Sequence, residues 1–178
     1  MDQEKAVVQI ILERFPVLEG HVRIQREKRV VMDYLVRRDF EKVFPYLTAS
    51  AGFDRLLTLF GTDDGDWLGL TYALVNQDEV VLLVRQRVPK ARPFIRSVCG
   101  RFPQALWQEQ ELRNLLGLEI EDLPEGGYPL PDGWPEQSYP LRKDWEVRRL
   151  NKSTLTYNQP RTSFGGQKED GRWICSTD

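Results

Sequence analysis

Hydrophobic residues recur at three- and four-residue intervals in three parts of the chain, which predicts three helices. The first covers residues 3–15 and ends at Pro16, because a proline removes a backbone donor. The second covers residues 38–51 and ends at Gly52, a typical helix terminator. The third covers residues 103–116 and begins with a proline. Each helix has one apolar face and should therefore pack against another layer of structure.

Alternation of apolar and polar positions predicts two strands, and three further strand segments are separated by turn residues at 62–66 and 76–78. Their expected ranges are residues 21–25, 29–34, 55–61, 67–75 and 79–87. The order helix, two strands, helix, three strands, helix keeps helices and hairpins apart, as in α+β folds. We therefore expect an antiparallel sheet with helices packed on one face, in the order αββαβββα.

The composition changes at Pro124. Six of the eleven prolines and six of the thirteen glycines lie from this residue onward. The same segment carries large aromatic residues, which normally need a surface that covers them. Among them are Trp134, Tyr139, Trp145, Tyr157 and Trp173. We predict an α+β domain over residues 1–123 and an extended tail over residues 124–178 that docks on a neighbouring protein.

Composition narrows the functional classes. Hydrophobic residues make up 40% of the chain and charged residues 29%, a globular balance. The formal net charge of -2 weighs against nucleic-acid binding, which needs a basic surface. The start of the chain is charged and its first apolar run is interrupted by Glu13 and Arg14, so we expect neither a signal peptide nor a membrane span.

Candidate catalytic and metal-binding residues are sparse. Cys99 and Cys175 lie far apart and His21 is the single histidine, so we expect no metal or iron–sulfur site within one copy. Glu109 and Glu111 could suggest acid–base catalysis, but residues two apart on a helix point to different sides. These acids are therefore interpreted as structural or docking residues. No catalytic, cofactor-binding or metal-binding residue is predicted.

Arg142, Lys143 and Asp144 form a short cluster of mixed charge near the end of the chain. Such a cluster can be a solvated turn. It can also be a docking clamp, because the planar guanidinium of arginine suits a partner carboxylate. The residues alone leave both interpretations open.

Two sequence blocks resemble a known family. The first is WQEQELRNLLGL, with Trp107, Glu109, Glu111 and Gly117, and the second is LPDGWPEQSYPLRKDW. Their succession resembles the 30 kDa subunit of NADH-quinone oxidoreductase (complex I). Gln110 stands where that family usually has an arginine. This and other departures, at Asn114, Asp122-Leu123 and Gly127-Tyr128, favour the version found in membrane-bound [NiFe] hydrogenase and formate hydrogenlyase-type complexes.

The resemblance implies a cofactor-free subunit at the cytoplasmic side of the cell membrane, attached to the membrane only through its partners. These partners would be a large subunit with a quinone or nickel–iron site and the iron–sulfur subunits of the same complex. The predicted docking residues are Trp107, Glu109, Glu111, Trp134, Arg142, Lys143, Asp144 and Trp145. One alternative is a free-standing binding domain whose tail captures an unrelated protein. Another is a small independent enzyme, but the sequence weighs against it because it offers no coherent nucleophile, metal set or cofactor loop.

Overall fold

The structure is a computed structural model that describes residues 2–126, 128–131, 134–145, 168–169 and 172–173. Two compact units are distinguished by their internal contacts. The first contains Met1–Leu130 and Gln137–Trp145, and the second contains Pro131–Glu136 and Glu146–Asp178. We call Gln137–Trp145 the anchor segment. Although it follows Pro124, it packs within the first unit, as do residues 124–126 and 128–130.

The three expected helices are present, and their ends follow the proline and glycine positions. They are α1 (Asp2–Arg14), α2 (Arg37–Ala49) and α3 (Leu106–Glu111). Short 3-10 turns precede β1 and α3, and α3 continues directly into a π-helical turn; these segments are η1 (Pro16–Leu18), η2 (Pro103–Ala105) and η3 (Leu112–Leu116). Gly117 ends η3 in the left-handed conformation with φ 75°, which a glycine adopts without steric cost.

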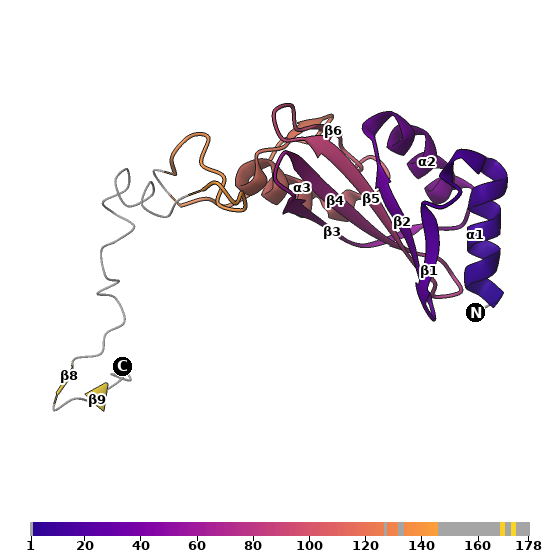
Figure 1. Ribbon diagram of the computed structural model, residues 1–178. Helices are drawn as coiled ribbons and strands as arrows, with labels where there is room; N and C mark the ends of the chain where they lie inside the picture. Colours follow the sequence, from indigo (N-terminus) through magenta and orange to yellow (C-terminus); the bar gives the residue numbers. More distant parts are fainter. Residues whose placement is uncertain (1, 127, 132–133, 146–167, 170–171, 174–178) are drawn as a thin grey trace. The chain divides into compact units, whose positions relative to one another are not determined.

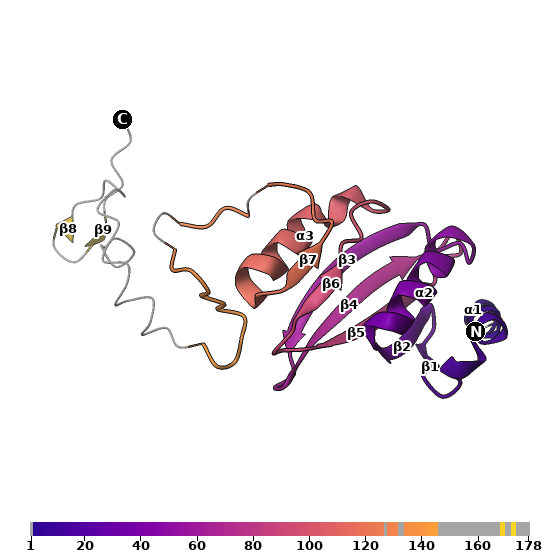
Figure 2. The same ribbon diagram turned by 90° about the horizontal axis from the view of Figure 1, so that it is seen from above.

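The five expected strands form one sheet in the order β1-β2-β5-β4-β3, as Figures 1 and 2 show. Their bounds are β1 Val22–Arg26, β2 Arg29–Leu35, β3 Arg55–Asp63, β4 Trp67–Val75 and β5 Val81–Pro89. Two further strands, β6 (Phe94–Arg96) and β7 (Glu119–Glu121), pair in parallel as a small second sheet. The sequence pattern did not indicate this second sheet, because each of its strands has only three residues.

The main sheet is mixed, so the expectation of a purely antiparallel sheet was wrong in one place. β2 pairs with β5 in parallel, from Arg29 opposite Val81 to Leu35 opposite Gln86. The other pairs of this sheet are antiparallel. β5 follows β3 and β4 in an antiparallel meander, which sets its direction. Its pairing with β2 joins segments that are far apart in the sequence. Alternation of residues reports a strand but not the direction of its neighbour.

The helices pack on one face of the sheet, as expected. Tyr72 of β4 is fully buried, and its ring centre lies 4.7 Å from that of Phe40 and 5.2 Å from that of Phe44, both in α2. Gly61 of β3 is on the same face, where an added Cβ would lie 2.6 Å from Cδ2 of Leu116 in η3. Helix α1 joins the same hydrophobic core. Figures 1 and 2 show α1 beside β1 and α3 beside β3, at opposite edges of the sheet.

The described part of the second unit contains two short strands. β8 (Lys168–Glu169) and β9 (Arg172–Trp173) pair in antiparallel fashion. Most of the expected extended tail falls on residues 127, 132–133, 146–167, 170–171 and 174–178, which lie outside the described residues.

Candidate functional site

A buried carboxylate at the end of β3 holds the anchor segment to the sheet. Oδ2 of Asp63 accepts hydrogen bonds from Nζ of Lys90 at 2.7 Å and from the main-chain N–H of Lys143 at 2.8 Å. Its Oδ1 accepts the main-chain N–H of Gly65 at 2.9 Å. Nζ of Lys90 also donates to Oδ1 of Asp144 at 3.1 Å. Lys90 therefore bridges one acid of the sheet and one acid of the anchor segment.

The charges of this cluster stabilise one another. Burial by itself would raise the pKa of Asp63, but the hydrogen bonds from Lys90, Lys143 and Gly65 outweigh it and lower this pKa to about 2. The hydrogen bond to Asp63 raises the pKa of Lys90. The hydrogen bond from Lys90 lowers the pKa of Asp144. All three groups are consequently charged at neutral pH, where the cluster is an ionic anchor.

Arg142 fixes the anchor segment to the end of the third helix. Its Nε donates to the carbonyl oxygen of Leu116 at 2.7 Å, and its Nη2 donates to that of Gly117 at 3.1 Å. These carbonyls have no partner within the helix, and a cation is favoured at a helix C-terminus. The guanidinium carbon also lies 4.5 Å from the ring centre of Tyr139. An added Cβ on Gly117 would lie 2.6 Å from Nη2 of Arg142, so the close approach requires glycine.

Glu109 occupies a different environment in the interior. Its side chain is fully buried and accepts hydrogen bonds from Oγ of Ser97 at 2.5 Å, N of Val98 at 2.7 Å and Sγ of Cys99 at 3.1 Å. The carboxylate thus ties α3 to the loop that follows β6. Burial raises the pKa of the Cys99 thiol to about 11, so this cysteine is a protonated donor at neutral pH, whereas a nucleophilic cysteine must be a thiolate.

The predicted docking residues therefore separate into four groups. Glu109 is internal, and Arg142, Lys143, Asp144 and Trp145 belong to the anchor segment. Nε1 of Trp145 donates to Oγ of Ser138 at 3.0 Å within that segment. Trp107, which is 60% exposed, and the partly exposed Glu111 lie on α3. Trp134 belongs to the second unit. Contact of any of these residues with a partner subunit remains a prediction.

In the structure, the predicted clamp binds groups of its own chain. The guanidinium of Arg142 and the main-chain N–H of Lys143 bind groups of this same chain. The side chains of Lys143 and Asp144 are exposed. The partners of the clamp, Asp63 and Lys90, were not identified as site residues from sequence. Asp63 lies in the segment 62–66, which indicated only a turn, and nothing local links it to a residue 80 positions later.

Neither a metal centre nor a membrane-spanning helix is found in the part of the chain that the structure describes. There, no group of three or more histidine, cysteine, aspartate or glutamate side chains could hold a metal ion. Within the same residues, no helix combines the length and the apolar composition that a membrane crossing requires. Cys175 lies outside the described residues, and the predictions of a cofactor-free and metal-free chain remain predictions.

The first unit is an α+β domain in which Asp63, Lys90, Asp144 and Arg142 hold the anchor segment. Residues 34–150 match the family described as respiratory-chain NADH dehydrogenase, 30 Kd subunit. The chain belongs to this family. The membership inferred from the two sequence blocks is thereby confirmed.

Relatives of the chain occur in several membrane-bound and respiratory systems. A subunit of the F(420)H(2) dehydrogenase of Methanosarcina mazei is 30% identical over 146 residues, which are 80% of this chain and 91% of that protein. Membrane-bound hydrogenase subunit beta of Pyrococcus furiosus is 31% identical over 150 residues, 81% of this chain and 87% of that protein. The chain is thus similar to oxidoreductase subunits of complex I-like and hydrogenase complexes.

The fold also occurs in a solved respiratory complex. A chain in the structure of the membrane-bound sulfane sulfur reductase, an archaeal respiratory membrane complex, superposes with a TM-score of 0.71. The match covers 97% of this chain and 99% of that chain at 19% sequence identity. At this identity the similarity establishes the shared fold.

Proposed function

We propose that this chain is a cofactor-free structural subunit of a membrane-bound oxidoreductase of the energy-converting hydrogenase or NADH-quinone oxidoreductase type. It docks on the large catalytic subunit and on the iron–sulfur subunits at the cytoplasmic side of the membrane. Its task is to hold these subunits in fixed geometry, so that the distances between redox centres in the partners are preserved. Family membership, with relatives in multi-subunit membrane-bound complexes, is the observation that carries this proposal.

The surface of α3 supports a docking role. Trp107 is 60% exposed. Tryptophan is among the side chains that most often concentrate binding energy at protein interfaces, so an exposed tryptophan indicates a docking surface. Glu111 lies one helical turn further on, so both residues are on neighbouring positions of the same surface. The adjacent Glu109 is buried and fixes α3 to the domain. A rigid helix that carries an exposed tryptophan and an acid is suited to hold a partner in one orientation.

The proposal is tested by Trp107→Ala and by Glu111→Gln in the native complex. We expect Trp107→Ala to weaken association by about 30-fold, since interface hot spots contribute about 2 kcal/mol. Glu111→Gln should cause a smaller loss of assembly. Turnover per assembled complex should stay unchanged in both variants, because neither residue touches a redox centre. The measurements are the yield of co-purified large subunit and the activity normalised to that yield.

Trp67→Ala is the matched control, because Trp67 is a second tryptophan with 40% exposure that lies on β4. It should leave the yield at the level of the unsubstituted chain. Full assembly with lost turnover in the Trp107→Ala or Glu111→Gln complex would contradict a structural role. Recovery of an unrelated protein, with no oxidoreductase subunit, would instead favour a free-standing binding domain.

A further inference from the structure

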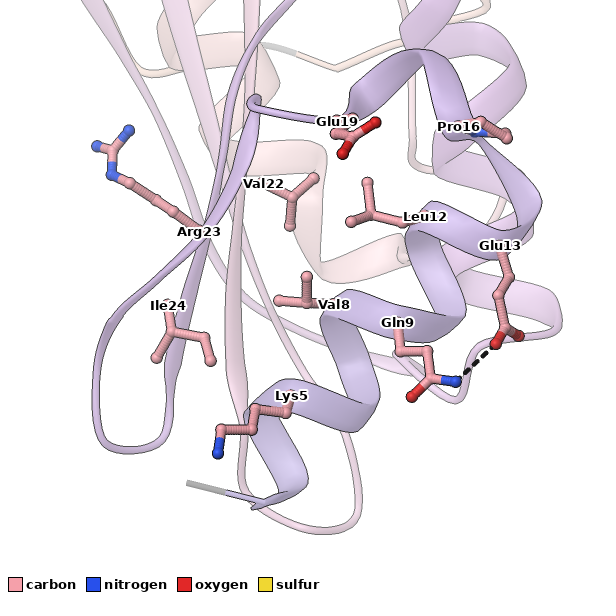
Figure 3. A pocket seen from close by; sticks show the side chains of 10 residues that line it. All are labelled: Lys5, Val8, Gln9, Leu12, Glu13, Pro16, Glu19, Val22, Arg23 and Ile24. Carbon is pink, nitrogen blue, oxygen red and sulfur yellow. Dashed lines mark hydrogen bonds between the residues drawn. The ribbon is translucent and has the colours of Figure 1, made fainter.

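An apolar groove of about 700 Å³ lies between α1 and β1. Figure 3 shows that Val8 and Leu12 of α1 face Val22 and Ile24 of β1 across this groove. Val8, Leu12 and Ile24 are only partly buried. The apolar floor of the groove therefore remains accessible in the first unit.

The groove follows an open edge of the main sheet. β1 is the outermost strand, and among the described residues no strand pairs with its outer side. The main-chain N–H of Asp33 donates to the carbonyl of His21 at 2.7 Å, and Arg23 is opposite Val31. Because hydrogen-bonded residues alternate in an antiparallel pair, the N–H and C=O groups of Val22 and Ile24 point away from β2.

This part of the edge is only partly protected against strand pairing. Such protection normally comes from short edge strands, charged side chains, proline, bulges or a covering helix or loop, and β1 is a five-residue strand. The register shift of β1 lies between Ile24 and Arg26, beyond the groove residues of the strand. The guanidinium of Arg23 is bound to the carboxylate of Asp33, and Figure 3 shows it pointing away from the groove. Val22 and Ile24 are β-branched and suit an extended pairing.

The two ends of the groove carry opposite charges. Lys5 lies at the end near Ile24, and Glu19 lies at the end near Val22 (Figure 3). Glu13 also lines the groove, but its carboxylate accepts a hydrogen bond from Nε2 of Gln9 at 2.7 Å on the side of α1 away from β1 (Figure 3). An extended ligand therefore meets a cation at one end, an apolar floor in the middle and the carboxylate of Glu19 at the other end.

We propose that this groove accepts an extended segment of a partner subunit, which adds to β1 as a sixth, antiparallel strand. Strand addition next to a helix supplies main-chain hydrogen bonds from the sheet edge and side-chain specificity from the groove. β1 runs from the acidic end to the Lys5 end, so an antiparallel segment begins at Lys5. The segment carries an acid at its N-terminal end, alternating apolar residues and a base at its C-terminal end.

The inference rests on the proposed function, because a partner subunit supplies the segment. It adds a second site at the edge of the sheet opposite to α3. A subunit with one docking site at each edge of a five-stranded sheet can bridge two neighbours. This is a physical basis for a scaffold role that one docking helix alone would not provide.

Residue-resolved amide hydrogen exchange tests strand addition in the purified complex. In the free chain, the amides of Val22 and Ile24 should exchange rapidly, while the amide of Arg23 should be protected by β2. In the complex, all three should be protected, with at least a tenfold slowing at Val22 and Ile24. If Val22 and Ile24 exchange equally fast in both states, the proposal is overturned. Co-purification of the chain is scored separately and decides the proposed function.

A peptide experiment on the isolated full-length chain tests the charge pattern. The probe is the peptide Glu-Thr-Val-Thr-Val-Thr-Lys, and its control is the same peptide with the terminal Glu and Lys exchanged. The probe should bind more tightly than the control in fluorescence anisotropy and should protect the amides of Val22 and Ile24. Lys5→Glu should weaken probe binding about threefold, as expected for an exposed ion pair.

Lys42→Glu is the matched control for Lys5→Glu, because Lys42 is exposed on α2 and outside the groove. It should leave the affinity for the probe unchanged. Equal affinity for both peptides, or equal loss in the Lys5→Glu and Lys42→Glu variants, would overturn the assigned direction and charge pattern. This result is obtained whether or not a complex is recovered.

Discussion

Asp63 shows how one carboxylate can join distant parts of a chain. The residue is 5% exposed and lies at the end of β3, where it binds Lys90 from the turn after β5 and the main-chain N–H of Lys143 from the anchor segment. A buried charge is tolerated only when it is paired and fully hydrogen-bonded. Here one ammonium group and two main-chain N–H groups provide those bonds.

The lowered pKa of Asp63 predicts an acid-dependent loss of stability. Its pKa is about 2 in the folded protein against 3.8 in the reference state, so the unfolded chain binds the proton more readily. The contribution of Asp63, about 2 kcal/mol, is complete above its unfolded pKa and is lost as the pH falls from about 4 to about 2. Urea unfolding from pH 6 to pH 2 measures this loss, and Asp63→Asn should remove that part of the pH dependence.

Asp66→Asn is the control for Asp63→Asn, because Asp66 belongs to the same turn and its side chain is exposed. We expect it to retain the pH dependence of the unsubstituted protein. If Asp63→Asn also retained that dependence, other carboxylates would be responsible and the anchoring role of Asp63 would be refuted.

At the scale of elements, the end of the third helix depends on a side chain from outside the helix. Arg142 satisfies the carbonyl groups of Leu116 and Gly117, while the left-handed conformation of Gly117 turns the chain toward β7. Helix termini leave such carbonyls without intrahelical partners. The helix end and the anchor segment therefore stabilise each other.

Gly117→Ala should destabilise the protein for two reasons. A Cβ in the left-handed conformation costs about 1 kcal/mol, and here it would also meet Nη2 of Arg142 at 2.6 Å. Displacement of Arg142 would remove hydrogen bonds to a charged group, which contribute about 1.5 kcal/mol or more. We expect the free energy of unfolding in urea to fall by about 3 kcal/mol.

Gly52→Ala separates the two contributions, because Gly52 follows α2 with φ 80° and has no atom within 4 Å of an added Cβ. It should lower the free energy of unfolding by only about 1 kcal/mol. Equal losses in Gly117→Ala and Gly52→Ala would mean that the contact with Arg142 does not stabilise the helix end.

At the scale of the whole molecule, the anchor segment extends the first unit beyond the expected domain boundary. Gln137–Trp145 packs with residues 1–130, whereas Pro131–Glu136 belongs to the second unit. The chain thus leaves the first unit and returns to it. Through Arg142 and Lys143, the returning segment contacts both the end of η3 and the buried Asp63.

Two truncated chains measure what the anchor segment contributes. One ends after residue 145 and the other ends after residue 136. The shorter chain lacks the donors of Arg142 and Lys143, so its free energy of unfolding should be lower by about 3 kcal/mol. Urea unfolding with far-UV circular dichroism measures the difference. Equal stability of the two chains would show that the anchor segment contacts the first unit without stabilising it.

Local features of the fold could be predicted from the sequence because they depend on neighbouring residues. The strand segment expected over residues 67–75, between two turn segments, predicted β4 with the bounds Trp67–Val75 that the structure has. Pro16, Gly52 and Gly117 marked the helix ends because each restricts or releases the backbone locally. The two sequence blocks also identified the family, since each is a pattern of short spacings.

Contacts between distant segments were decided only by the tertiary structure. The parallel pairing of β2 with β5 and the bond from Lys143 to Asp63 each join residues about 50 to 80 positions apart. Hydrophobic periodicity records which face of an element is buried, but it does not record which element covers that face. For this reason the sequence marked Arg142, Lys143 and Asp144 as either a solvated turn or a clamp, and only the fold determined that Arg142 and Lys143 bind groups of their own domain.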